Sequence, residues 1–213
     1  MSTQTMLSAS TRRDTLPAVT ATARPYHHGS LRPALLAAAE RALARGGDLS
    51  LRGLAREIGV SHAAPRRHFA DKQALLDALA QDGFERLGSE MAAALARVDG
   101  FHEGLQALAR TYVRFATEHA ALLELMYAGK HRPGADALRE AADRAFAAPF
   151  ELFAEAQARG DIAAGDGLRA GMVSWSAFHG LASMANSGML GDLELEPLVD
   201  QAVEQLLDGL VPR

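Results

Sequence analysis

The sequence predicts an all-α protein. Leu and Ala dominate its 213 residues, whereas aromatic residues make up only 6% and Val and Ile are scarce. Strands favour the β-branched and aromatic residues that are rare here. After residue 30 the apolar residues recur mainly at helical spacing, and no segment shows the alternation of a strand. We therefore expect about nine helices and no sheet.

The first two expected helices have clear start signals. Ser30 is placed to cap a helix over residues 31–45, and Ser50 is placed to cap a shorter one over residues 51–58. Gly46 would end the first of them, because glycine accommodates the left-handed backbone that commonly follows a helix.

A third helix is expected over residues 62–69, after a turn at Gly59 and with Ser61 as its cap. The remaining helices are expected over residues 71–98, 101–118, 120–127, 136–159, 168–187 and 196–210. Pro149 lies inside one of them and predicts a kink there, because proline lacks the amide that the helical ladder needs.

Charge is divided unevenly along the chain. Residues 24–72 carry nine basic and four acidic side chains, whereas residues 73–213 carry 11 basic and 21 acidic ones. The overall net charge of -4 therefore hides a basic module ahead of an acidic body. This division indicates a polyanion-binding head on a body that does not touch the polyanion.

Several classes of protein are disfavoured. The chain has no cysteine, which excludes a disulfide scaffold and a thiolate metal site. His27 and His28 are adjacent but have no further ligand cluster, so we expect no metal and no cofactor. No apolar segment of a secretory signal follows the N-terminus, so we expect a cytoplasmic protein. Residues 170–191 carry no charge but hold four Ser and four Gly, which favours a buried helix over a membrane span.

Residues 50–69 read as a helix-turn-helix. Ala55 supplies the small residue that two steeply crossing helices need at their contact, and Gly59 supplies a turn residue free to take a positive φ. The expected third helix would then expose small and basic side chains, which suit close approach to base edges and bidentate donation to them.

The stretch from Ser50 to Lys72 resembles the N-terminal DNA-binding domain of the tetracycline-repressor (TetR) family. Gly59-Val60-Ser61, His68-Phe69 and Lys72 match that family's signature. Two positions depart from it: Pro65 replaces an aliphatic residue and Arg66 replaces a tyrosine. Pro65 would fall within the first helical turn, where a missing amide is tolerable.

The resemblance implies which residues contact DNA. Carried over by position, Arg52, Ser61, Arg66, His68 and Lys72 would hold phosphates. His62, Ala63 and Arg67 would lie nearest to base edges, and Arg66 could take either role.

The resemblance extends into the C-terminal part of the chain. Trp175, His179 and Gly180 resemble the Trp-x-x-x-His-Gly element of one TetR subgroup, and the last two helices of the family commonly form a dimeric four-helix bundle. The helix over residues 168–187 has apolar or small residues all around it, so it must be covered on every side, in keeping with a homodimer. The expected interface residues are Gly180, Ala182, Ser183, Leu198, Ala202 and Leu206.

The same part could enclose an apolar effector. The expected pocket residues are Tyr112, Phe115, Tyr127, Phe150, Met172, Trp175 and His179, although aromatic residues at helical spacing are more often plain core.

Three segments follow from these observations: a flexible arm over residues 1–23, a helix-turn-helix DNA-binding domain over residues 24–72, and a ligand-binding and dimerisation domain over residues 73–213. The predicted function is that of a homodimeric transcriptional regulator, a repressor released from a near-palindromic operator by a small apolar effector. Two alternatives stay open: an all-α enzyme that uses the apolar pocket, and a helix-turn-helix adaptor that acts only through protein contacts.

Overall fold

The computed structural model describes residues 31–163, 165 and 167–210, and all regular secondary structure in this part of the chain is helical. Its elements are α1 (Leu31–Ala44), α2 (Leu51–Glu57), the 3-10 helix η2 (Pro65–Arg67), α3 (Lys72–Leu95), α4 (Phe101–Glu118), α5 (Ala120–Lys130), α6 (Asp136–Arg159), α7 (Gly167–Asn186) and α8 (Leu195–Leu210). The predicted fold class is confirmed. The predicted arm over residues 1–23, the Ser30 cap and the His27-His28 pair lie outside the described residues.

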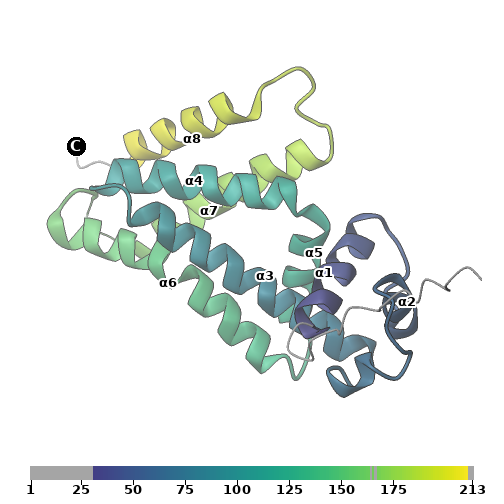
Figure 1. The fold of residues 1–213 in the computed structure, drawn as a ribbon. Helices are drawn as coiled ribbons and strands as arrows, with labels where there is room; N and C mark the ends of the chain where they lie inside the picture. Colours follow the sequence, from purple (N-terminus) through teal and green to yellow (C-terminus); the bar gives the residue numbers. More distant parts are fainter. Residues whose placement is uncertain (1–30, 164, 166, 211–213) are drawn as a thin grey trace, which may run out of the picture.

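A small N-terminal lobe is built from α1, α2, η2 and the start of α3 (Figure 1). Leu35, Leu54 and Leu75 come from three different helices and are fully buried together. The predicted cap of α2 is confirmed, because Ser50 Oγ accepts from the amide of Gly53 at 3.0 Å. Asp71 caps α3 in the same way, with Oδ1 accepting from the amide of Ala74 at 2.8 Å.

The larger C-terminal body is a layered helical bundle. The helix α3 continues out of the N-terminal lobe and packs along α6, while α4 packs against α7 and α8 covers the outer side (Figure 1). The helices α3 and α6 approach closely at Gly88, where an added Cβ would lie 2.8 Å from the Ala145 Cα. The helix α6 runs through Pro149, and its axis changes direction along its length (Figure 1).

The predicted third helix over residues 62–69 is wrong in type and length. In its place are a turn and the single 3-10 turn η2. The amides of Ala64, Arg67 and His68 donate to carbonyls three residues back. Pro65 explains this geometry, because it has no amide to donate to the Ser61 carbonyl, and the tighter spacing leaves fewer groups unpaired. The predicted Ser61 cap is also not formed: Ala64 precedes η2, without a side-chain cap bond.

In the described part of the chain, no helix is long and apolar enough to cross a membrane.

Candidate nucleic-acid interface and ligand cavity

The N-terminal lobe presents a basic face. Arg52, His62, Arg66 and Lys72 line one surface hollow of about 490 Å³, formed where α2, the turn before η2 and the start of α3 meet. Residues far apart in the sequence are thus brought together, as the predicted interface requires. The other predicted residues, Ser61, Ala63, Arg67 and His68, are exposed on the same short segment.

The orientation of this segment is set by its apolar residues. Pro65 and Phe69 are buried against the lobe's core, which turns the intervening Arg66, Arg67 and His68 outward. Within the described part of the chain, neither Arg66 nor Arg67 forms an ion pair. By contrast, Arg41 on α1 and Arg45 in the turn after it both pair with Glu57 on α2. The charge available to a polyanion therefore includes Arg66 and Arg67 at η2 and Lys72 at the α3 start.

Two carboxylates lie at this face, and both take part in helix caps: Asp71, which lines the hollow and caps α3, and Asp48. The hydroxyl and the amide of Ser50 both donate to Asp48, and these bonds lower the pKa of that carboxyl below its usual value, with smaller contributions from Lys72 and Arg56. Asp48 is therefore committed to fixing the α2 cap.

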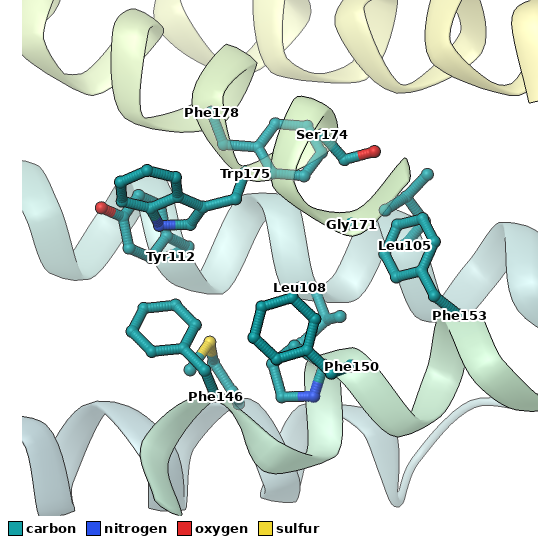
Figure 2. A pocket seen from close by; sticks show the side chains of 12 residues that line it. Leu105, Leu108, Tyr112, Phe146, Phe150, Phe153, Gly171, Ser174, Trp175 and Phe178 are labelled. Carbon is teal, nitrogen blue, oxygen red and sulfur yellow. The ribbon is translucent and has the colours of Figure 1, made fainter. Parts of the chain in front are cut away.

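A small apolar cavity lies inside the C-terminal body, between α3, α4, α6 and α7 (Figure 2). Its volume is about 40 Å³. Apart from Ser174, the lining residues are apolar or aromatic. The full lining is Met91, Leu105, Leu108, Tyr112, Phe146, Pro149, Phe150, Phe153, Gly171, Ser174, Trp175 and Phe178. Of the predicted pocket residues, Tyr112, Phe150 and Trp175 line this cavity.

A second, outer hollow of about 310 Å³ adjoins the cavity. Phe146, Phe150 and Trp175 line both spaces. The predicted pocket residues Tyr127 and Met172 lie in this outer hollow. Three aromatic rings thus stand between the interior of the protein and a space open to solvent.

Contrary to the prediction, His179 lines neither space, and neither does Phe115. The Phe115 ring lies one helical turn beyond Tyr112 and packs on His119, with 4.8 Å between ring centroids. The guanidinium of Arg86 covers it at 5.8 Å. Leu105 and Leu108 line the cavity but were not predicted to, because helical periodicity marks an inward face without distinguishing a packed core from a cavity.

Four side chains form a polar cluster at one end of the cavity. The Tyr112 hydroxyl lies 2.8 Å from His179 Nδ1 and 3.3 Å from the Tyr127 hydroxyl. Trp175 stacks on His179, with centroids 5.0 Å apart and the rings tilted by 17°. Burial raises the pKa of both tyrosines and lowers that of His179. The cluster is therefore uncharged at neutral pH.

This burial predicts a pH dependence of stability. The pKa of His179 in the folded protein is below its usual value of 6.5, so the unfolded chain takes up this proton first as the pH falls. The contribution is fully present above about pH 6.5 and is lost as the pH falls through the folded-state pKa. We expect the urea midpoint to drop between pH 7.5 and pH 5.5, and to drop less in His179→Gln. If the urea midpoint fell equally in the parent and in His179→Gln, the pH dependence of stability would come from other groups.

A chain of contacts joins the cavity to the N-terminal lobe. The helix α4 lines the cavity with Tyr112 and ends at Glu118, directly before His119. Glu40 on α1 accepts from Arg86 Nη1 at 2.7 Å and lies 3.0 Å from His119 Nδ1. Arg86 Nη2 lies 3.2 Å from His119 Nε2, so a neutral imidazole protonated at Nδ1 satisfies both contacts. The three side chains link α1, α3 and α4.

The helix α7 carries an exposed apolar face. All the large apolar side chains that are strongly exposed in the described residues lie on α7 or the loop after it: Leu168, Met172, Val173, Met184, Met189 and Leu193. Of the predicted interface residues, Ser183 is exposed, whereas Gly180, Leu198, Ala202 and Leu206 are half-buried. Ala182 is 1% exposed and packs inside its own protomer. The exposed apolar residues of α7 therefore include Val173, whereas Ala182 is not among them.

Among the described residues, no three His, Asp or Glu side chains gather in a way that could hold a metal ion.

Comparisons with known proteins agree with this architecture. The family described as "Bacterial regulatory proteins, tetR family" matches residues 35–79, and the one described as "Tetracyclin repressor-like, C-terminal domain" matches residues 105–210. A protein with unknown function from Rhodococcus sp. RHA1 is 46% identical, with a TM-score of 0.83, over 89% of this chain and 100% of that chain. A TetR family transcription regulator from Marinobacter aquaeolei VT8 shares the fold at 19% identity and a TM-score of 0.71, over 87% of this chain and 97% of that chain. No curated protein matches the chain.

Proposed function

The chain belongs to the TetR family of bacterial transcriptional regulators, and from this premise we propose that it is a homodimeric repressor that leaves a near-palindromic operator when a small apolar molecule enters the cavity. Proteins of this family bind DNA operators and dimerise. The matched families are described as regulators, so the enzyme alternative falls away.

The observation that carries the DNA-binding part is the placement of Arg66, Arg67 and Lys72. All three are exposed and lie within one short segment that Pro65 and Phe69 anchor to the core. Lys72 is a flexible point charge suited to a phosphate, whereas the planar guanidinium of Arg67 suits a base edge. We assign Arg52, Ser61, Arg66, His68 and Lys72 to phosphates, and His62, Ala63 and Arg67 to base edges.

The dimer part is supported by the exposed apolar face of α7. Single exposed apolar residues are ordinary, but contiguous patches mark interaction sites. We place the dimer interface on this face together with α8, and we assign Trp175, His179 and Gly180 to the Trp-x-x-x-His-Gly subgroup. The cavity is the proposed effector site, and Glu40, Arg86 and His119 are the contacts through which its state reaches α1.

Two substitutions test the proposed DNA interface. Lys72→Ala should weaken binding to all sequences alike and lower the salt dependence, d log K/d log[salt], by about one unit. Arg67→Ala should relax base preference at one position of each half-site, at a cost of about 1–3 kcal/mol on the operator. Binding to operator and unrelated DNA, measured by fluorescence anisotropy across salt concentrations, checks both.

A matched control is Arg97→Ala, which removes an exposed cation from the C-terminal body instead of the basic face. It should leave the salt dependence unchanged. If Lys72→Ala and Arg67→Ala bound the operator as tightly as the parent, the interface would lie elsewhere. If the affinity of the parent protein for DNA did not fall as the salt concentration rises, a helix-turn-helix adaptor that acts only through protein contacts would be favoured.

A further inference from the structure

The cavity contains no charge. Of its lining residues only Tyr112 is ionisable, and burial raises its pKa, so it stays neutral. Ser174 is the other hydroxyl in the lining, and its Oγ already donates to the Ala170 carbonyl at 3.0 Å. A charged ligand group placed here would lose its hydration without a counter-charge, which is strongly unfavourable. The lining therefore selects for uncharged groups.

One polar atom at the cavity is poorly satisfied. Trp175 Nε1 is buried and forms no hydrogen bond of good geometry among the described residues, and the hydroxyls of Tyr112 and Tyr127 are the acceptors near it. The indole lies beside Tyr112 and Tyr127, with ring centroids 6.4 and 5.9 Å away, and its nitrogen is on the side that faces Tyr112 (Figure 2). Buried donors are nearly always paired, and leaving one unpaired costs about 1–3 kcal/mol. An acceptor on a bound molecule would remove that cost.

The cavity is too small for a ligand unless its wall moves. On the same scale a water molecule needs about 10–15 Å³, so about 40 Å³ holds only a few waters. Phe146 and Phe150 are half-buried and stand between this space and the outer hollow. Rotation of these two rings would join the spaces, and their combined volume would then fall within the range of ordinary ligand sites. Trp175 lines both spaces, so its Nε1 would lie along the joined site.

The outer hollow adds two opposite charges. Lys130 Nζ lies 4.7 Å from the centroid of the Tyr127 ring, and Asp143 acts on the same ammonium group. Because the two charges offset each other, the outer hollow carries no net charge to hold an anionic head. The competing occupant is a carboxylate ligand that pairs with Lys130.

We infer that the ligand of this protein is an uncharged, largely apolar molecule with a hydrogen-bond acceptor, to which Trp175 Nε1 donates. Phe146 and Phe150 swing aside to admit its body. This inference rests on the proposed function, since it takes the cavity as the effector site.

Three probes with one skeleton test the inference by isothermal titration calorimetry on the full chain at pH 7.5. They are 4-phenylbutan-2-one, which has a neutral acceptor; 3-phenylpropanoate, which is nearly isosteric but anionic; and butylbenzene, which has no oxygen. We expect the ketone to bind at least about 10-fold more tightly than the carboxylate, and about 3- to 10-fold more tightly than butylbenzene, the range of one net hydrogen bond.

A variant isolates the donor. Trp175 is the only tryptophan of the chain, so incorporation of 3-benzothienylalanine in its place changes one position and exchanges the N–H for sulfur in a ring of nearly the same shape. The advantage of the ketone over butylbenzene should disappear in this variant, while the affinity for butylbenzene stays within about twofold. Circular dichroism checks that the protein is folded, and Trp175→Phe gives a second variant without the donor.

Several outcomes would overturn the inference. The first is that 3-phenylpropanoate binds more tightly than the ketone and that Lys130→Met abolishes this binding. The second is that the ketone still binds more tightly than butylbenzene after the N–H is removed. The third is that none of the three probes binds. Any of them would leave operator binding, and with it the regulator function, untouched. Conversely, the ketone could bind in a way that depends on the N–H and yet leave the operator complex intact. That result would uphold the ligand chemistry and contradict the proposal that a ligand in the cavity releases the DNA.

Discussion

Val173→Arg should convert the dimer to a monomer and lower operator affinity by about 100- to 10,000-fold, the range expected when a second linked binding event is lost. Val173 is 60% exposed on α7, so arginine there disturbs no protomer core. In an isologous interface each substitution occurs twice, which places two cations in one apolar contact. Sedimentation velocity measures the oligomeric state, and fluorescence anisotropy on the operator measures the affinity.

The matched control for this variant is Ala154→Arg, which adds the same charge to an exposed position of α6. It should stay dimeric and bind the operator as the parent does. A dimeric Val173→Arg protein would move the interface away from the α7 face. Ala182→Arg would be less informative, because Ala182 is buried in its own protomer and the substitution would test folding instead.

Glu40→Gln should uncouple ligand binding from DNA release. Glu40 joins α1 to both Arg86 and His119, and its side chain is 24% exposed, so these contacts are only partly screened by solvent. Loss of the carboxylate weakens the link between α1 and the end of α4. We expect the ligand concentration for half-maximal operator release to rise by about 5- to 150-fold, the usual span of an allosteric coupling energy.

In the absence of ligand, Glu40→Gln should bind the operator with an affinity within about threefold of the parent's. In the absence of DNA, it should bind the ligand with an affinity within the same range. Glu90→Gln is the matched control, because it breaks a comparable ion pair with Arg114 that joins α3 to α4 and does not reach α1. Titration of each operator complex with the probe ketone gives the release curves. Parent-like release by Glu40→Gln would show that coupling does not pass through this contact.

Much of the fold could be predicted because the signals that set it are local. The caps at Ser50 and Asp71 depend on side chains that reach their own helix within three residues. Gly160 ends α6 in the left-handed conformation that glycine favours. Such features appear in the sequence as residue types at fixed offsets.

The η2 segment shows where this reasoning failed. Pro65 was expected to sit harmlessly in a first helical turn, yet here the whole element is only one 3-10 turn long, so the missing amide affects most of it. The exposure of Arg66 and Arg67 was still predictable. The two arginines are exposed because Pro65 and Phe69 on either side of them are buried. Apolar residues that flank charged ones predict this arrangement for an α-helix and for a 3-10 helix alike.

The cavity and its link to α1 could not be predicted, for two reasons. Helical periodicity places Tyr112 and Phe115 on inward faces, but only the neighbouring helices decide that Tyr112 meets the cavity and Phe115 meets His119. The Glu40 contacts join residues separated by 46 and 79 positions, and no spacing rule connects them. Both features arise from packing of the whole chain.

The most direct test of regulation by this protein is selection of its operator from fragmented genomic DNA of its source, followed by release with the probe ketone. We predict enrichment of a near-palindromic sequence whose half-sites lie about one DNA turn or somewhat more apart. Its affinity for the protein should fall steeply with salt, and the ketone should release it at the concentrations at which Trp175 fluorescence changes. Recovery of no common sequence, with weak binding that does not depend on salt, would contradict the account.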